Sequence, residues 1–148
     1  MKRGAVVAAV CGAAILTACG GDGGDRLSRE ELVSQADAIC GEYEQKLDAL
    51  GEPQTIQEVE SLADDAKPIV EEGVGKLEQL QPPEELEDDY DRWIELNHDS
   101  VAVIDDLKDA AASGDEAQVR QVVQEAQAKE NEADALAGEI GFDECAQD

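Results

Sequence analysis

The chain has 148 residues, with 37 Asp and Glu against 11 Lys and Arg, which gives a formal net charge of -26. Proteins that bind DNA or RNA neutralise phosphates with clustered Lys and Arg, so this balance excludes nucleic acid as a partner. The single histidine and the 3% of aromatic residues also leave little material for aromatic cages or for metal centres built from several histidines.

The first 18 residues are typical of a secretory signal peptide. A short positive start precedes an uncharged run from Gly4 to Ala18, which is well below the roughly 20 residues of a membrane-spanning helix. The run ends in the sequence Leu-Thr-Ala-Cys at residues 16–19. This motif resembles the lipobox of bacterial lipoproteins, whose cysteine carries diacylglycerol and becomes the first mature residue. The resemblance implies cleavage after Ala18 and lipidation of Cys19; the alternative is an ordinary secreted protein cut nearby.

A glycine-rich stretch follows the lipobox and has no hydrophobic periodicity, so we expect a flexible tether. Several acyl chains on one cysteine anchor a protein stably, whereas a single chain binds a membrane only reversibly. The sequence thus predicts a signal peptide at residues 1–18, a lipidated cysteine and tether at 19–27, and a folded domain at 28–148. We expect the protein on the extracytoplasmic face of the cell membrane, held through Cys19.

Four cysteines become two after this processing, because Cys11 leaves with the signal peptide and Cys19 carries lipid. The remaining pair, Cys40 and Cys145, predicts a disulfide in an exported chain, where the compartment is oxidising. The alternative is a catalytic or metal-binding thiol pair. It lacks a Cys-x-x-Cys motif and has only one histidine to support it.

Four segments repeat apolar residues at spacings of three and four, which is typical of amphipathic helices. These segments cover residues 28–50, 55–80, 83–113 and 115–140. Three of them start with residues suited to capping: Ser28 with Glu31, Thr55 with Glu58, and Asp115 with Gln118. No stretch shows the alternation of a β-strand. Short connections make neighbouring helices antiparallel, so we expect an all-α, up-down-up-down four-helix bundle.

Three local features qualify this bundle. Pro68 predicts either a kink near residues 66–68 or two shorter helices. Cys145 reaches Cys40 either if the first turns of the first helix overhang the bundle or if residues 141–145 fold back along that helix; we favour the fold-back, with Phe142 as an apolar plug. Asn97 lies within the apolar stripe of the third segment, where a buried Asn sets packing register or binds a ligand. The competing interpretation is disorder, because the content of large aliphatic residues is low, but the regular stripes and caps favour order.

One candidate metal site stands out. Asp91, Glu95 and His98 are spaced by four and three residues, which places them on one face of a helix. A di-metal site is excluded because it needs a second Glu-x-x-His motif. The alternative is a solvated helix face.

Acidic residues also crowd residues 84–91. A helix N-terminus favours negative charge, so we expect helix stabilisation there. A calcium site is the alternative, but no Asp-x-Asp-x-Asp-Gly loop is present.

The chain has no Gly-x-Ser-x-Gly elbow and no glycine-rich phosphate loop. We therefore expect no enzymatic activity and no cofactor. The segments Ala-Asp-Ala-Ile-Cys at 36–40 and Gly-Phe-Asp-Glu-Cys at 141–145 resemble the framing motifs of small, uncharacterised lipoproteins from high-GC Gram-positive bacteria. This resemblance implies a disulfide-linked helical bundle and no particular activity.

The sequence thus predicts a lipid-anchored helical bundle at the cell surface that acts as a binding or envelope-interaction module. Its partners would be the membrane, through Cys19, and an envelope protein or a small ligand. The alternative is a metal-ion-binding lipoprotein that uses acidic residues and His98. Because the membrane surface is anionic, we expect the acidic bundle to stand off from it and to face outward.

Overall fold

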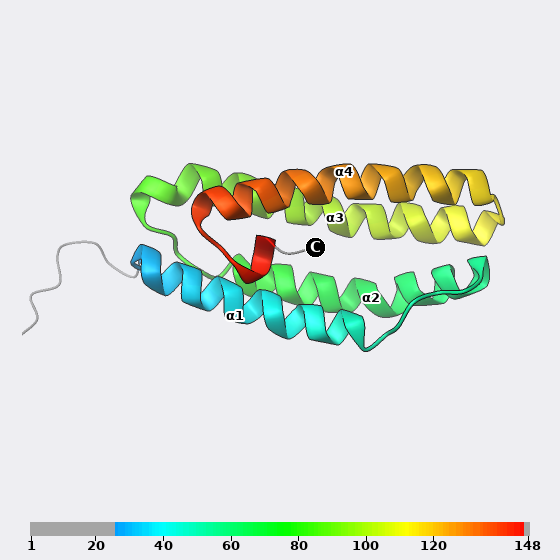
Figure 1. The fold of residues 1–148 in the computed structure, drawn as a ribbon, viewed down its shortest axis with the longest axis horizontal. Coiled ribbons are helices and arrows are strands. Elements are labelled where there is room, and N and C mark those ends of the chain that lie inside the picture. Colours follow the sequence, from blue (N-terminus) through cyan, green and yellow to red (C-terminus); the bar gives the residue numbers. More distant parts are fainter. Residues whose placement is uncertain (1–25, 147–148) are drawn as a thin grey trace, which may run out of the picture.

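The computed structural model describes residues 26–146. The expected signal peptide, the lipobox cysteine Cys19 and most of the tether lie outside the described residues. Within the described range the elements are α1 (Arg29–Asp48), α2 (Ile56–Leu77), the 3-10 turn η1 (Glu84–Leu86), α3 (Glu87–Ser113), α4 (Glu116–Ile140) and the 3-10 turn η2 (Glu144–Ala146). Successive helices run in opposite directions (Figure 1), which confirms the up-down-up-down helical bundle.

The helix ends follow the capping residues of the sequence. Ser28 and Glu31 form a reciprocal capping box at the start of α1. The Thr55 side chain accepts a hydrogen bond from the Glu58 backbone N–H, and Asp115 accepts two from the first turn of α4. Glycines in the left-handed region end α3 and α4, with φ values of 72° at Gly114 and 105° at Gly141.

Two boundaries differ in detail from the expectation. α2 runs unbroken from Ile56 to Leu77 with Pro68 inside it, so the expected alternative of two shorter helices is wrong. The third helix begins four residues after the second proline of the Pro82-Pro83 pair. Pro83 is extended, with ψ 151°, and the one-turn η1 lies between it and Glu87.

The hydrophobic core lies at one end of the bundle, where α1 begins and α4 ends. Three aromatic rings meet there: Trp93 and Phe142 have centroids 5.0 Å apart, and Tyr90 lies 5.7 Å from Trp93. All three side chains are about 98% buried. The Tyr90 hydroxyl donates a 2.7 Å hydrogen bond to the Leu77 carbonyl, and burial raises its pKa well above the usual range. The predicted role of Phe142 as an apolar plug is confirmed.

The bundle is open between its first and last helices. α2 packs along α3, and α3 packs along α4, but α1 and α4 contact each other only weakly. The turn η2 lies between them and contacts both (Figure 1). The predicted disulfide fixes it there, since Cys145 is bonded to Cys40 of α1 with a Cα–Cα distance of 5.2 Å. The chain therefore folds back along α1, as predicted.

Among the described helices, none combines the length and the apolar character needed to cross a bilayer.

Candidate functional site

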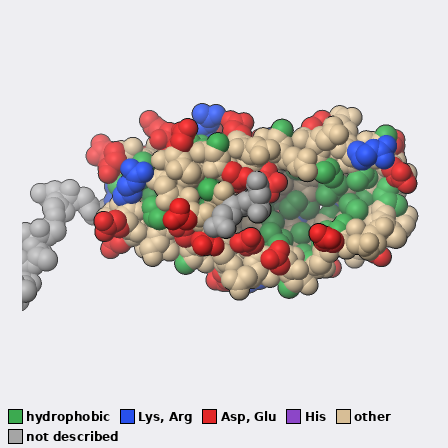
Figure 2. Space-filling view, in the orientation of Figure 1, with side chains coloured by type: hydrophobic (Ala, Val, Ile, Leu, Met, Phe, Trp, Pro, Cys, Tyr) green, Lys and Arg blue, Asp and Glu red, His purple; other side chains and the backbone are tan. Residues whose placement is uncertain are grey.

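The open side of the bundle forms a groove, which we call the α1/α4 groove. All four helices line it, together with Cys145, and its volume is about 420 Å³. Figure 2 looks onto this face and shows a hollow with hydrophobic side chains inside it. The lining residues with apolar side chains are Ile39, Tyr43, Leu47, Val70, Val74, Leu77, Trp93 and Ala133.

The groove exists because α1 is shorter than the helices around it and the C-terminal turn closes only one end. α1 has 20 residues, whereas α3 has 27 and α4 has 25. At 1.5 Å per residue, α1 falls about 10 Å short of α3. Gly51, with φ 76°, turns the chain away after α1, and residues 49–55 connect it to α2 without a helix.

Tyr43 forms part of the groove floor and packs directly on α2. A Cβ atom placed on Gly73 would lie 3.0 Å from Tyr43 Cγ and 3.2 Å from Cδ1. Gly73 is therefore the residue that lets the ring lie flat against the α2 backbone. Lys46 Nζ lies 3.9 Å and Lys76 Nζ 4.8 Å from the centroid of the ring, so two ammonium groups cover it.

The two lysines are held by a shared carboxylate. Glu42 Oε1 lies 2.9 Å from Lys46 Nζ and 3.3 Å from Lys76 Nζ. The hydrogen bond from Lys46, followed by that from Lys76, lowers the pKa of Glu42 below its usual value. Both lysines are thus already paired with a carboxylate of the protein itself.

The rims of the groove are acidic. Glu44 and Asp48 line it from α1, and Glu130 and Asp134 line it from α4. Glu44, Asp48 and Glu130 are exposed, and none of the ion pairs among the described residues includes them. No cation lies among the lining residues. The groove thus combines an apolar floor with negative rims on both sides.

Polar groups on α3 complete the floor. Asn97 and Ser100 are half-buried and line the groove. The Asn97 amide donates a 2.9 Å hydrogen bond to the Trp93 carbonyl, and the Ser100 hydroxyl donates one of 3.2 Å to the Leu96 carbonyl. Both donated bonds stay within α3, so these bonds do not set the register between helices.

The closed end of the groove is fixed by the C-terminal turn. Asp37 Oδ1 accepts hydrogen bonds from the backbone N–H groups of Asp143 and Glu144, both at 3.0 Å. The Arg29 guanidinium donates a 2.7 Å hydrogen bond to the Ile140 carbonyl, a backbone group that the end of α4 leaves unpaired. The disulfide and these contacts hold the turn rigidly between α1 and α4.

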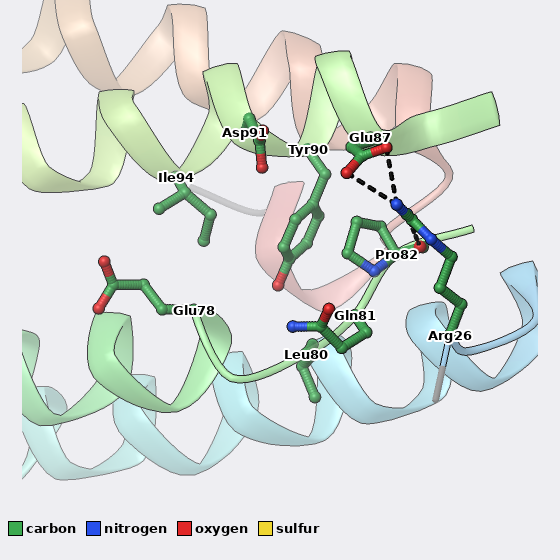
Figure 3. Close-up of a pocket in the computed structure, with 9 residues that line it drawn as sticks. All are labelled: Arg26, Glu78, Leu80, Gln81, Pro82, Glu87, Tyr90, Asp91 and Ile94. Carbon is green, nitrogen blue, oxygen red and sulfur yellow. Dashed lines mark hydrogen bonds and ion pairs between the residues drawn. The ribbon is translucent and has the colours of Figure 1, made fainter. Parts of the chain in front are cut away.

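The start of the described chain is fastened at the same end of the bundle. Arg26 donates to the Pro82 carbonyl at 2.9 Å and pairs with both carboxylate oxygens of Glu87 at 2.9 Å (Figure 3). The Leu27 backbone N–H donates a 2.8 Å hydrogen bond to the Gln81 carbonyl. A small pocket lies beside this contact, and its lining includes Arg26, Gln81, Pro82 and Glu87.

The structure does not assemble the expected metal ligands. Among the described residues, no group of three or more His, Cys, Asp or Glu lies close enough to hold a metal ion. His98 Nε2 instead lies 2.7 Å from Glu78 Oε1 at the end of α2. Asp91 lines the small pocket beside Arg26, whereas Glu95 and His98 line a separate surface depression, so the three residues do not converge.

The acidic residues at the start of α3 lie in its first turns, as the preference of a helix N-terminus for negative charge predicts. Glu87 is the one that pairs with Arg26. The described part of this cluster forms no ligand group for calcium.

The sequence did not predict the α1/α4 groove. Regular stripes on four segments suggest a closed bundle in which the first and last helices meet. Two signals pointed to the groove: the early stop of the first segment at Gly51, and the need for residues 141–145 to fold back beside Cys40. Comparisons with family models, with curated proteins and with solved structures found no match to this chain.

Proposed function

We propose that this protein is a lipid-anchored binding module on the extracytoplasmic face of the cell membrane, and that the α1/α4 groove is its ligand site. The groove carries the proposal. It is preformed, its floor is apolar and aromatic, and its volume of about 420 Å³ falls in the range of about 300–1,000 Å³ that is common for ligand sites.

The rigidity of the groove supports this role. Its closed end is fixed by the disulfide between Cys40 and Cys145, and its floor includes the buried ring of Trp93. A rigid site binds with less loss of conformational entropy than a site that must order itself. A disulfide of this kind also suits an oxidising compartment outside the cytoplasm.

The anchor rests on the lipobox-like motif that ends at Cys19. The chain enters the bundle at Arg26, at the end of the bundle opposite the open end of the groove (Figure 1). A tether attached there would leave the groove accessible from the side and from the end far from the membrane.

The anchor is tested by expressing the full chain in a bacterium that processes lipoproteins and by measuring its distribution between membrane and soluble fractions. Cys19→Ser should move the protein to the soluble fraction, because the acyl chains can no longer be attached. Cys11→Ser is the matched control, since this cysteine lies in the expected signal peptide, and should leave the protein on the membrane. Membrane retention of a Cys19→Ser protein that has lost its signal peptide, as judged by its mass, would contradict the anchor.

The ligand site is tested with Nile red, a neutral dye whose emission rises in apolar grooves. The dye should bind the exported Cys19→Ser chain, and adding Ser100→Phe should reduce binding, because the new ring would fill the groove floor. Ala102→Phe is the matched control, since Ala102 is exposed on the same helix and does not line the groove. Equal dye binding by the two variants would contradict the assignment.

A further inference from the structure

We infer that the occupant of the α1/α4 groove is a cationic amphipathic helix, presented by a partner protein or peptide at the cell surface. This inference rests on the proposed function, because it names the ligand class of the same groove. Three features of the molecule lead to it: the space between two helices, the distribution of apolar side chains, and the charge of the rims.

The space has the form of a missing helix position. α1 and α4 contact each other weakly, and the turn η2 fills only the end of the gap between them. α3 packs against both α2 and α4, and Figure 2 shows a hollow that stays open on this face of the bundle. A helix laid in this gap would pack against helices on both sides and would complete the bundle, which is the geometry of helix-in-groove recognition.

Apolar surface continues along the gap toward the far end of the bundle. A second depression of about 270 Å³ lies where α2 and α4 begin; its lining includes the apolar residues Ile56, Val59 and Val119 and the ion pair of Glu116 with Arg120. Figure 2 shows hydrophobic side chains along the hollow in this direction. The α4 rim from Asp134 back to Val119 has 16 residues and is about 22 Å long at a rise of 1.5 Å per residue. A site this long suits a helix of about four turns better than a small molecule.

Many apolar side chains of the helices are only half-buried, which indicates that the core is incompletely covered. Along the groove and toward the far end of the bundle, eight apolar side chains keep part of their surface in contact with solvent, whereas Ala63, Ala110, Ala111 and Val122 are buried. These half-buried residues are Val59, Leu62, Ile69, Val70, Val101, Ile104, Leu107 and Val119. An apolar helix face would remove this surface from water, which is the main favourable term in such binding.

The charge of the rims selects a cationic partner. Glu44, Asp48 and Glu130 carry no ion pair among the described residues, whereas each lysine of residues 26–146 has at least one carboxylate within ion-pair distance. Residues 26–146 therefore offer negative charge at the groove and contain no free lysine. An anionic occupant, such as a fatty acid or an acidic peptide, would be repelled from both rims.

The inference is tested with an 18-residue peptide of Leu and Lys in which Leu recurs at spacings of three and four. Isothermal titration calorimetry on the exported Cys19→Ser chain should show saturable binding in the micromolar range or tighter, about tenfold stronger than that of two control peptides. One control replaces every Lys by Glu; the other keeps the composition but alternates Leu and Lys, which favours a strand.

Charge variants separate the effect of the rim carboxylates on peptide affinity from the effect of the net charge of the protein. The rim variant combines Glu44→Gln, Asp48→Asn and Glu130→Gln, and it should weaken binding of the Leu/Lys helix about tenfold. The matched control combines Asp65→Asn, Glu95→Gln and Glu139→Gln, three exposed carboxylates that do not line the groove. It makes the same change in net charge and should leave the affinity within about a factor of two.

Equal weakening in the two triple variants would overturn the inference, because binding would then follow net charge alone. Equal binding of the Leu/Glu peptide would also overturn it. If Nile red binds the groove and the Leu/Lys helix does not, the occupant is wrong and the proposed function stands. If neither binds, both fail.

Discussion

At the scale of single residues, the contact between Tyr43 and Gly73 shows how one small side chain shapes the site. A glycine inside a helix normally lowers stability, since it loses more conformational freedom than alanine on folding. A Cβ added at Gly73 would lie only 3.0 Å from Cγ of the Tyr43 ring, whereas a Cβ on Gly75 would meet nothing within 4 Å. Two glycines two residues apart thus have different roles.

This difference gives a paired prediction. Gly75→Ala should raise the free energy of unfolding by about 0.5–1 kcal/mol, because it restores helix propensity without a clash. Gly73→Ala should not show this gain and should displace the Tyr43 ring, which is held under Lys46 and Lys76. Urea denaturation followed by circular dichroism measures both. A gain of equal size in the two variants would show that Tyr43 moves freely.

The capping box at Ser28 gives a second prediction at this scale. Hydrogen bonds from the Ser28 backbone N–H and hydroxyl lower the pKa of Glu31, whose carboxylate they stabilise. A lowered pKa in the folded state means that the stabilisation is present above the unfolded pKa and is lost as the pH falls through the folded value. NMR titration of the Glu31 carboxyl should give a value below 4.5, the usual value for this group.

The control for this titration is Ser28→Ala, which removes the hydroxyl. The pKa of Glu31 should rise toward its usual value, and the cooperative unfolding of α1 should shift to lower temperature. The backbone N–H of residue 28, the larger cause, remains in Ser28→Ala, so an unchanged Glu31 pKa would show that the hydroxyl does not stabilise this carboxylate.

At the scale of elements, the C-terminal turn η2 replaces a direct contact between α1 and α4. It brings Phe142 into the aromatic core and bonds Cys145 to Cys40. The same turn closes one end of the α1/α4 groove. Its position therefore controls both the stability of the bundle and the shape of the site.

Removal of the disulfide should be costly. It links residues separated by 105 positions, and for a loop of that length the chain-entropy model gives up to about 4–5 kcal/mol. The double variant Cys40→Ser, Cys145→Ser should lower the free energy of unfolding by an amount approaching this value. Chemical denaturation of the oxidised, reduced and double-variant proteins measures it. Equal stability of all three would show that the remaining contacts of η2 suffice.

The elements also show what a sequence can reveal and where it fails. Stripes and caps predicted the helices, because Ser28, Thr55 and Asp115 satisfy backbone donors locally. The disulfide followed from cysteine counting, and the plug by Phe142 followed from the fold-back that this disulfide needs in an antiparallel bundle. The exact start of α3 was missed because a proline pair can precede either a 3-10 turn or an α-helix. The groove was missed because apolar stripes do not show where neighbouring helices end relative to one another.

The metal interpretation shows the same limit at the level of a site. Residue spacing placed Asp91, Glu95 and His98 near one helix face. It could not show which side chains of the neighbouring helix would pair with them. Glu78 at the end of α2 pairs with His98 instead.

At the scale of the whole molecule, charge is the dominant feature. The chain has 37 acidic and 11 basic residues, so most carboxylates are left over when the cations pair with carboxylates of other helices, as Lys67 does with Asp105 and Arg92 with Glu132. These pairs are partly exposed, and each contributes little to stability. Repulsion among the remaining carboxylates should therefore outweigh them.

Salt should stabilise the protein as a result. Raising NaCl from about 0.02 M to 0.5 M shortens the screening length severalfold, which weakens repulsion across the whole surface. We expect the melting temperature, measured by calorimetry at pH 7, to rise with NaCl. A fall would show that the ion pairs between helices contribute more than the net repulsion costs.

The same distribution of charge and apolar surface underlies the central claim, which is that the α1/α4 groove binds ligands. NMR chemical-shift mapping with the Leu/Lys helical peptide tests it most directly. The largest changes should fall on Leu47, Trp93, Asn97 and Glu130, which line the groove from three helices, and Asp65 and Glu139 should change little. Changes spread evenly over the acidic surface would contradict the claim.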